Sequence, residues 1–181
     1  MNDSIIYEPR TGTEVSNAVA GAPVYVYSEL VREAERVGPV QMLINMMQRS
    51  LDNFILVQNP NKMNSGHWTA LKFKPFTKEI YFFSTYGGKP DTEKNLWISP
   101  NDLIRSHQVP NIINDGLKVF ALNGWKIHYN QHEYQHKGDK TATCGIWSAA
   151  FLNDGENPDQ FYRRTKRQRL SAEDYYNFYF S

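Results

Sequence analysis

Residues 141–152 read TATCGIWSAAFL, a stretch that is apolar on almost every side once it has passed its cysteine. A helix that is apolar all round is buried within a protein instead of lying on its surface. The stretch therefore predicts a buried central helix over residues 144–152, against which the rest of the chain packs. Cys144, the only cysteine of the chain, stands at the start of this helix.

The segments around this helix alternate between extended and helical patterns. Short apolar or alternating runs predict strands at 54–57, 67–73, 79–84 and 125–129. The first three are joined by short connections, so they are expected to form an antiparallel meander. Start and stop signals predict helices at 28–37, 39–47, 100–106, 112–122, 159–169 and from 171 onward. This order indicates an α+β fold with a mixed or antiparallel central sheet flanked by helices.

The chain of 181 residues is the length of one domain. Residues 1–23 are polar or small and have no apolar period, so they are expected to form a loosely ordered N-terminal arm. Residues 24–181 then make up the single folded domain.

Composition excludes several classes of partner and site. The net charge of +1 gives no global field toward an acidic partner. No apolar run reaches membrane-spanning length, and the first twenty residues lack the apolar stretch of a signal peptide. One cysteine allows no internal disulfide, which is typical of a reducing compartment. The expectation is a soluble intracellular protein without a membrane partner and without a required cofactor.

Cys144 has two interpretations. At a helix N-terminus, free backbone amides and the helix dipole stabilise a thiolate, the form that attacks a carbonyl carbon. Thr141 or Thr143 can cap the helix, and Gly145 would let a substrate backbone come close. The alternative is that Cys144 is a small buried apolar residue with no chemical role.

His67 and Gln135 supply the other groups that thiol catalysis needs. His67 lies where a polar loop enters a predicted strand, which would place its ring at a sheet end, open to solvent and suited to proton transfer. Gln135 could donate its side-chain amide to the oxyanion of a tetrahedral intermediate. Taken singly, a loop histidine and a surface glutamine without functions explain these residues equally simply.

Together these positions match a family pattern. The order Gly66-His67-Trp68, the strand 81–87 reading YFFSTYG, Gln135 and Thr143-Cys144-Gly145 resembles the adenovirus-type and SUMO-deconjugating cysteine proteases. In sequence, these motifs are most similar to those of the maturation proteases of adenoviruses, virophages and Polinton-like elements. The resemblance covers roughly residues 50–155.

The resemblance implies a permuted papain-like fold in which His67 is the base, Cys144 the nucleophile and Gln135 the oxyanion donor, with Trp68 packed beside them. It implies a cysteine endopeptidase that processes viral capsid or structural precursors, in the host cytoplasm, a viral factory or the virion. Removal of ubiquitin-like proteins and an inactive binding or scaffold module are the alternatives.

The sequence departs from the family at the acidic position, which aligns with Ser84. Cys144 and His67 then act as a dyad with Ser84 or water orienting the ring, or Asp91 or Asp102 supplies the acid. The spacing between Gln135 and Cys144 is long, so Gln131 is an alternative donor. A disulfide-linked peptide activator, as in adenovirus, would consume Cys144, because the chain has no second cysteine.

Two further patterns bear on metals and nucleic acids. His128, His132 and His136 have helical spacing, but Tyr129, Asn130 and Gly138 interrupt a helix there, and no metal site is predicted. A basic cluster near the C-terminus is either a solvated helix face or a DNA contact. Its members are Arg163, Arg164, Lys166, Arg167 and Arg169.

Overall fold

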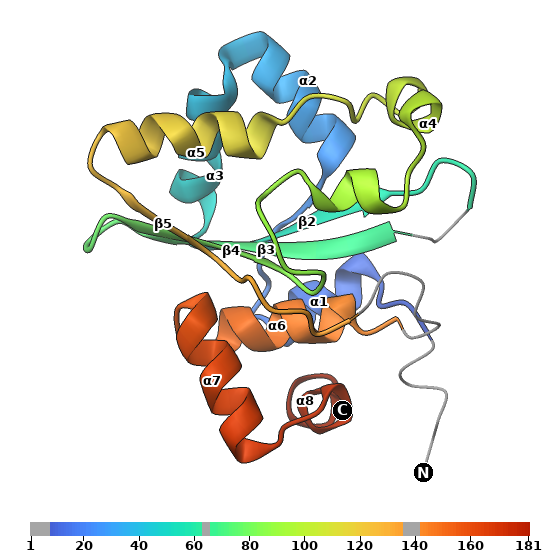
Figure 1. The fold of residues 1–181 in the computed structure, drawn as a ribbon, viewed down its shortest axis with the longest axis vertical. Coiled ribbons are helices and arrows are strands. Elements are labelled where there is room, and N and C mark those ends of the chain that lie inside the picture. Colours follow the sequence, from blue (N-terminus) through green and yellow to red (C-terminus); the bar gives the residue numbers. More distant parts are fainter. Residues whose placement is uncertain (1–7, 63–65, 136–141) are drawn as a thin grey trace.

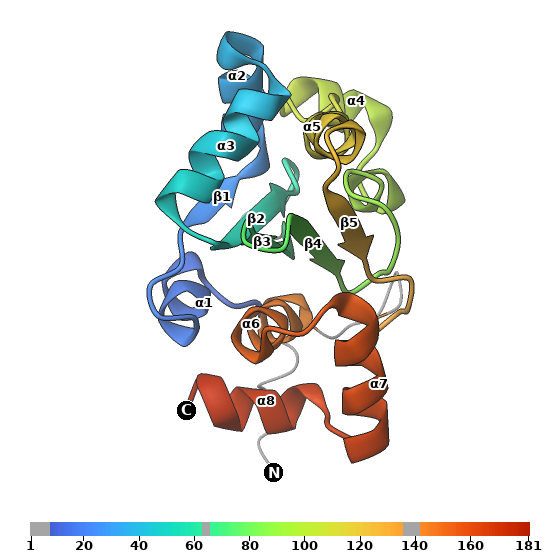
Figure 2. The ribbon, with the colours of Figure 1, turned by 90° about the vertical axis from the view of Figure 1, so that its left-hand side faces the viewer.

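The computed structural model describes residues 8–62, 66–135 and 142–181. A five-stranded sheet lies between two layers of helices (Figures 1 and 2). The structure is therefore α+β with a mixed central sheet, as the sequence predicts. Among the described residues, no helix combines the length and the apolar character that a bilayer crossing needs.

The strands follow one another across the sheet in chain order. They are β1 (Val24–Val26), β2 (Asp52–Gln58), β3 (Gly66–Lys74), β4 (Glu79–Ser84) and β5 (Lys126–Tyr129). The central three form the predicted antiparallel meander, whereas β1 and β5 pair in parallel with β2 and β4. The register of β3 against β4 pairs Thr69 with Ser84, which brings the ends of both strands to the same edge of the sheet.

One face of the sheet is covered by α2 (Tyr27–Val37), α3 (Pro39–Arg49) and α5 (Ile112–Leu122). Leu71 and Phe73 of β3 point to this side and pack with Leu30, Leu43 and Leu117 of the helices. The segment between β4 and α5 carries the 3-10 helix η1 (Glu93–Leu96) and α4 (Pro100–Arg105). These short elements lie on the same side of the sheet (Figure 1).

The other face is covered by α1 (Gly12–Ala18), α6 (Cys144–Asp154), α7 (Pro158–Gln168) and α8 (Ala172–Tyr179). Every residue of α6 from Cys144 to Leu152 is buried, which confirms the central helix. Phe83 of β4 stacks on Phe151 of α6 with ring centroids 4.9 Å apart. Aromatic packing therefore fixes α6 against the strand that ends at Ser84.

The second half of the predicted N-terminal arm is folded, so the expectation of a loose arm over residues 1–23 is wrong from residue 8 onward. Thr11 and Glu14 form a reciprocal capping box at the start of α1. Val15 and Val19 are buried in the core that contains α6. The sequence pattern hides this helix because only one face of two turns is apolar. Residues 1–7 lie outside the described part of the chain.

Candidate active site

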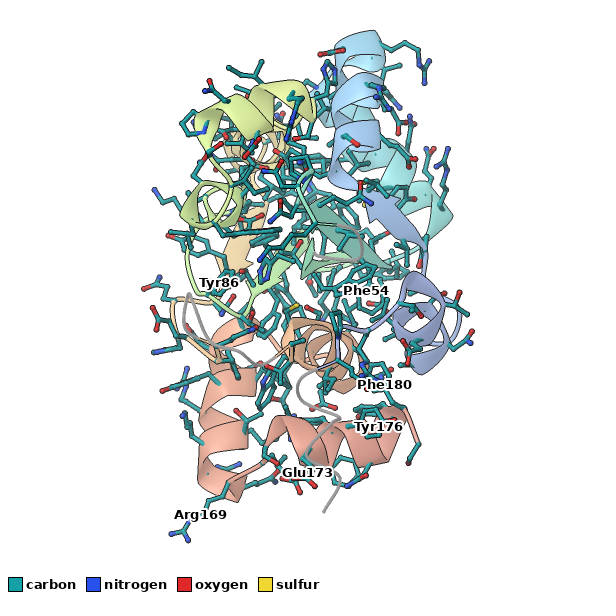
Figure 3. The ribbon with its side chains drawn as sticks, turned by 90° about the vertical axis from the view of Figure 1, so that its right-hand side faces the viewer. Phe54, Tyr86, Arg169, Glu173, Tyr176 and Phe180 are labelled. Atoms are coloured by element: carbon teal, nitrogen blue, oxygen red, sulfur yellow. The ribbon has the colours of Figure 1, made fainter. Side chains whose placement is uncertain are left out.

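His67 lies near the start of β3 and Ser84 at the end of β4, so the two meet at the same end of these antiparallel strands. His67 Nε2 lies 3.0 Å from Ser84 Oγ, and both side chains are buried. The His67 ring also stacks on Tyr86, with centroids 4.3 Å apart and an interplanar angle of 18°. Figure 3 shows Tyr86 at this edge of the molecule. The two contacts fix the ring plane and occupy Nε2, so a reacting group has to approach through Nδ1.

Asn130 holds Ser84 in place, a role that the sequence did not reveal. Its Oδ1 accepts the backbone N–H of Ser84 at 2.9 Å, and its Nδ2 donates to the Ser84 carbonyl at 2.6 Å. Asn130 is completely buried. Because it follows β5 directly, this side chain extends the sheet pairing by one residue and fixes the end of β4. Its only signal in the sequence is a polar residue immediately after a predicted strand.

Cys144 lies at the start of α6, as predicted, close to the segment that carries His67. The backbone amide of Trp68, the residue after His67, lies close enough to the Cys144 sulfur to favour its charged form and so to lower the pKa of the thiol. The amides of Gly145 and Cys144 itself also face the sulfur. The fold thus brings together two segments that are far apart in the sequence. Thr143 occupies the N-cap position without a side-chain cap bond, and Thr141 lies outside the described residues.

Burial makes the thiol and the imidazole neutral in the unliganded protein. Cys144 is 7% exposed, and desolvation raises the pKa of its thiol although the three amides oppose this shift. His67 is 2% exposed, and desolvation lowers its pKa to about 3. The expectations of a solvent-open ring and of a stabilised thiolate are therefore wrong for this state. The physical reason is that withdrawal from water disfavours both charged forms.

Trp68 is wedged between α6 and the N-terminal segment. Its Nε1 donates to the Arg10 carbonyl at 2.9 Å. A Cβ added to Gly145 would lie 3.1 Å from both Trp68 Cδ1 and Arg10 Cβ. The absence of a side chain at Gly145 accordingly serves close packing with Trp68 and Arg10, which corrects the expectation that it admits a substrate backbone.

Gln135 is buried against the strand end, whereas its alternative Gln131 is exposed. The backbone N–H of Gln135 donates to the Thr85 carbonyl at 3.1 Å, and its Oε1 accepts the Thr85 hydroxyl at 3.2 Å. Thr85 directly follows Ser84, so Gln135 belongs to the same edge as His67. The Thr85 hydroxyl therefore orients the side-chain amide of Gln135.

The two alternative acids lie in other networks. Asp91 is buried, where it accepts the Tyr27 hydroxyl at 2.6 Å and the Asn114 amide at 2.7 Å. Asp102 accepts bonds from Ser99 and Arg105 at α4. Neither contacts His67, because each already stabilises a separate part of the fold. Of these three candidates, Ser84 is the one whose side chain contacts His67.

The basic cluster is divided by the fold. Arg164 is tied to Asp154, Glu156 and Tyr175 of neighbouring segments, so it is not part of an exposed DNA-contacting face. The other four residues, Arg163, Lys166, Arg167 and Arg169, are exposed, and Figure 3 shows Arg169 extending away from the protein.

The described residues between His128 and Gln135 are not helical, in line with the interruption that the sequence indicates. His128 lies in β5, and His132 stacks on Tyr162 of α7. His136 lies outside the described residues. Within the described parts of the chain, no group of three or more metal-ligating side chains comes together.

Comparison with known proteins gives two kinds of similarity. No family model matches the chain. The uncharacterized protein V9 of Sputnik virophage is 33% identical over 87 residues, which cover 48% of this chain and 46% of V9. The chain therefore matches about half the length of that relative.

Solved structures with a similar shape include the SUMO protease Ulp1. In the form whose catalytic cysteine is oxidised to a sulfinic acid, the match has a TM-score of 0.42 and 12% identity, and covers 86% of this chain and 74% of Ulp1. The sulfonic acid form gives a TM-score of 0.41 and 13% identity over 82% of this chain and 66% of that one. No residue role is carried over from these matches.

Proposed function

We propose that this protein is a cysteine endopeptidase in which Cys144 is the nucleophile, His67 the general base and acid, and Gln135 an oxyanion donor. One observation carries the proposal. The His67 ring is fixed by Ser84 through Nε2, while the backbone amide of the next residue, Trp68, lies beside the Cys144 sulfur. A nucleophile beside a base that a third group orients is the arrangement that covalent catalysis requires.

The neutral resting pair defines the order of proton transfers. As the Cys144 sulfur attacks the peptide carbonyl, His67 accepts the thiol proton and the carbonyl oxygen becomes negative. Gln135 Nε2 and the Cys144 backbone N–H stabilise that oxygen. His67 then donates the proton to the leaving amine as the C–N bond breaks. Water hydrolyses the thioester, giving a carboxylic acid and restoring the thiol.

A thiolate that forms beside His67 would raise the low pKa of its imidazole, because an adjacent opposite charge favours the charged form. Exclusion of water by the substrate alone would lower that pKa further, so the ion pair forms only if the two charges are adjacent. Ser84 accepts or donates one hydrogen bond but carries no charge, so it orients the ring without stabilising imidazolium strongly.

We infer that the substrates are structural precursors of a virus-like element. The similarity to a virophage protein supports this source, and the sequence resemblance to maturation proteases supports this class of substrate. Deconjugation of a ubiquitin-like protein is the alternative within the same chemistry. The two are separated by incubating one preparation with a capsid precursor and with a ubiquitin-like fusion, and by sequencing the new termini.

A non-catalytic binding module is the second candidate, and the burial of both reacting groups favours it. A raised thiol pKa and a lowered imidazole pKa describe an inert pair as well as a resting enzyme. Cleavage of a peptide library, read by mass spectrometry, separates the two. The enzyme should produce new termini, and these should disappear in Cys144→Ala and fall about a hundredfold or more in His67→Ala. Equal products from the wild type and Cys144→Ala would refute the peptidase.

A matched control distinguishes loss of chemistry from loss of structure. Lys118 is exposed on α5, on the face of the sheet opposite α6, so Lys118→Ala should cleave like the wild type. If neither the wild type nor any variant cleaves the library, while Cys144 resists alkylation in the folded protein at every pH, the binding module is the better description.

A further inference from the structure

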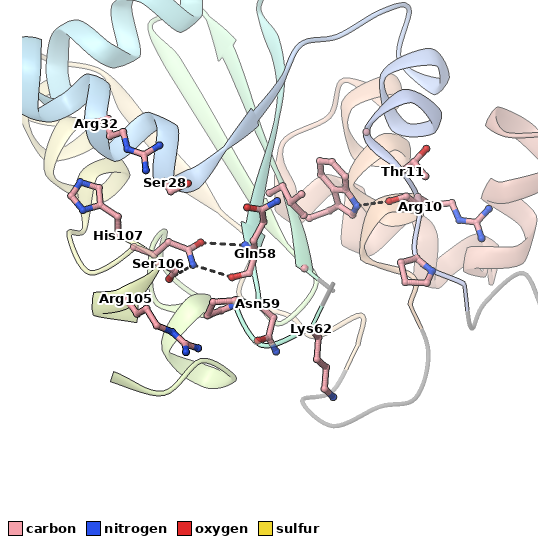
Figure 4. Close-up of a pocket in the computed structure, with 17 residues that line it drawn as sticks. Arg10, Thr11, Ser28, Arg32, Gln58, Asn59, Lys62, Arg105, Ser106 and His107 are labelled. Carbon is pink, nitrogen blue, oxygen red and sulfur yellow. Dashed lines mark hydrogen bonds between the residues drawn. The ribbon is translucent and has the colours of Figure 1, made fainter. Parts of the chain in front are cut away.

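A cleft of about 690 Å³ opens beside Trp68 on the side away from α6. Its walls come from the N-terminal segment 9–12, α2, the end of β2 and the residues that follow α4 (Figure 4). Gly66 and Trp68, the neighbours of His67 on both sides, belong to the lining. The cleft therefore adjoins the segment that carries the proposed base.

The ionisable side chains of the cleft are all basic. Its walls include Arg10, Arg32, Lys62, Arg105 and His107, and no aspartate or glutamate occurs among the described residues that line it. Figure 4 shows Arg32 beside Ser28 and His107, and Lys62 farther along, beyond Asn59. In a protein whose net charge is only +1, such a concentration of cations is local.

The two arginines Arg10 and Arg105 are already paired, at 3.3 Å from Glu14 and 2.9 Å from Asp102. His107 lies 3.1 Å from Glu35. Arg32 and Lys62 have no ion pair with any residue in the described part of the chain. The free positive charge of the cleft therefore resides on Arg32 and Lys62.

The inner wall is neutral and held in place by its own hydrogen bonds. Gln108 is 1% exposed, its Oε1 accepts the Gln58 amide at 3.2 Å and its Nε2 donates to the Gln58 carbonyl at 2.9 Å. This pairing occupies the edge of β2 where it passes β1, so a ligand does not gain backbone bonds at Gln58. Recognition in the cleft then depends on the basic side chains at its mouth.

We propose that this cleft binds an acidic stretch of the protein substrate, with Arg32 and Lys62 as specificity-determining residues. The inference rests on the proposed peptidase function and adds the substrate class. Charge complementarity is the physical reason, because two unpaired cations facing one opening favour carboxylates over neutral side chains. The common residue Trp68 connects this cleft to the Cys144 sulfur, which favours a peptide that continues toward the thiol.

The test measures binding without catalysis. Two fluorescent peptides of equal length, one rich in aspartate and glutamate and the other with asparagine and glutamine in their place, are titrated with the Cys144→Ala protein. The acidic peptide should bind about tenfold more tightly, and rising salt should remove the difference. The Arg32→Ala/Lys62→Ala double variant should lose the preference. Arg167→Ala, which removes an exposed cation outside the cleft, should keep it.

Three outcomes would overturn the proposal. These are equal affinity for both peptides, a preference that survives in the double variant, and tighter binding of a single-stranded oligonucleotide that depends on Arg32 and Lys62. The last outcome would assign the cleft to nucleic acid. The binding test uses a protein without the nucleophile, so its results can be interpreted even if the peptidase proposal fails. If the wild type cleaves peptides but Cys144→Ala binds the acidic and the neutral peptide equally, only the acidic specificity is rejected.

Discussion

The imidazole of His67 and the hydroxyl of Ser84 lie 3.0 Å apart, joined through Nε2 and Oγ. The β3–β4 register fixes this distance. Ser84 pairs with Thr69, and His67 lies two residues before Thr69, so its side chain points to the same face of the sheet. Asn130 fixes Ser84 in turn. A hydroxyl that can both donate and accept thus holds the ring where a carboxylate would add a charge.

Replacing Ser84 by alanine should lower turnover without changing the fold. Ser84→Ala leaves Nε2 without its partner, so the ring loses one of the two contacts that orient it. We expect kcat for peptide cleavage to fall about ten- to a hundredfold, with KM little changed. Ser50→Ala, which removes a hydroxyl at the far end of β2, is the control and should leave kcat unchanged. An unaltered kcat in Ser84→Ala would show that the ring needs no such partner.

Acid should destabilise the protein through His67. Its pKa in the folded protein is about 3, below the value of about 6.5 in the unfolded chain. Between these values the unfolded chain binds a proton that the folded protein excludes, so the free energy of unfolding falls as the pH drops from about 6.5 toward 3. Urea titrations should show a smaller loss between neutral and mildly acidic pH in His67→Gln than in the wild type. His107→Gln, at an exposed position, should lose as much as the wild type.

Gly145 should tolerate no side chain. In Gly145→Ala the new Cβ would press on Trp68 and on Arg10 at 3.1 Å, and both of these side chains are buried. The expected cost is about 1–3 kcal/mol of unfolding free energy, measured by urea or thermal denaturation, together with reduced cleavage because Trp68 moves.

Gly12→Ala is the matched control for this change. A Cβ at Gly12 would meet Trp68 Cη2 at an ordinary 3.9 Å, and alanine favours the helix in which residue 12 lies. Its stability should equal or exceed that of the wild type. If Gly145→Ala is as stable as Gly12→Ala, the packing between α6 and Trp68 is looser than the structure indicates.

Two glutamines near the strand end allow a direct comparison of roles. Gln135→Ala removes the buried amide that Thr85 orients, and we expect turnover to fall about a hundredfold or more. Gln131→Ala changes an exposed side chain and should have no effect on turnover. The reverse ranking would make Gln131 the donor. Steady-state rates at saturating peptide are the relevant measurement, since an oxyanion contact forms only during the reaction.

Local signals predicted most of the secondary structure. The helix at 112–122 has the predicted bounds, and Ser171 and Asp174 form the expected capping box at α8. Apolar periodicity and caps act within a few residues, so they are readable along the chain. β1 was missed because three residues carry no period, and α1 because a tertiary contact with α6 stabilises it.

The sequence indicates which residue types form the candidate site, but it does not indicate their burial or their contacts. His67, Ser84 and Gln135 lie at one end of β3 and β4. Asn130 and Tyr86 were not identified, because their roles arise from contacts between β4, β5 and the loops that follow them. The burial of His67 was also missed, since solvent access depends on every segment that packs around a side chain.

Local patterns along the chain are enough to specify the α+β element order, the buried helix that begins at Cys144 and the kinds of chemical group available to it. The contact of Ser84 with His67, the filling of the space over Gly145 by Trp68 and Arg10, and the neutral thiol and imidazole arise only from long-range packing. The difference lies in the distance along the chain over which each interaction acts. Helix and strand patterns depend on neighbours along the chain, whereas desolvation and packing depend on groups that meet only after the chain has folded.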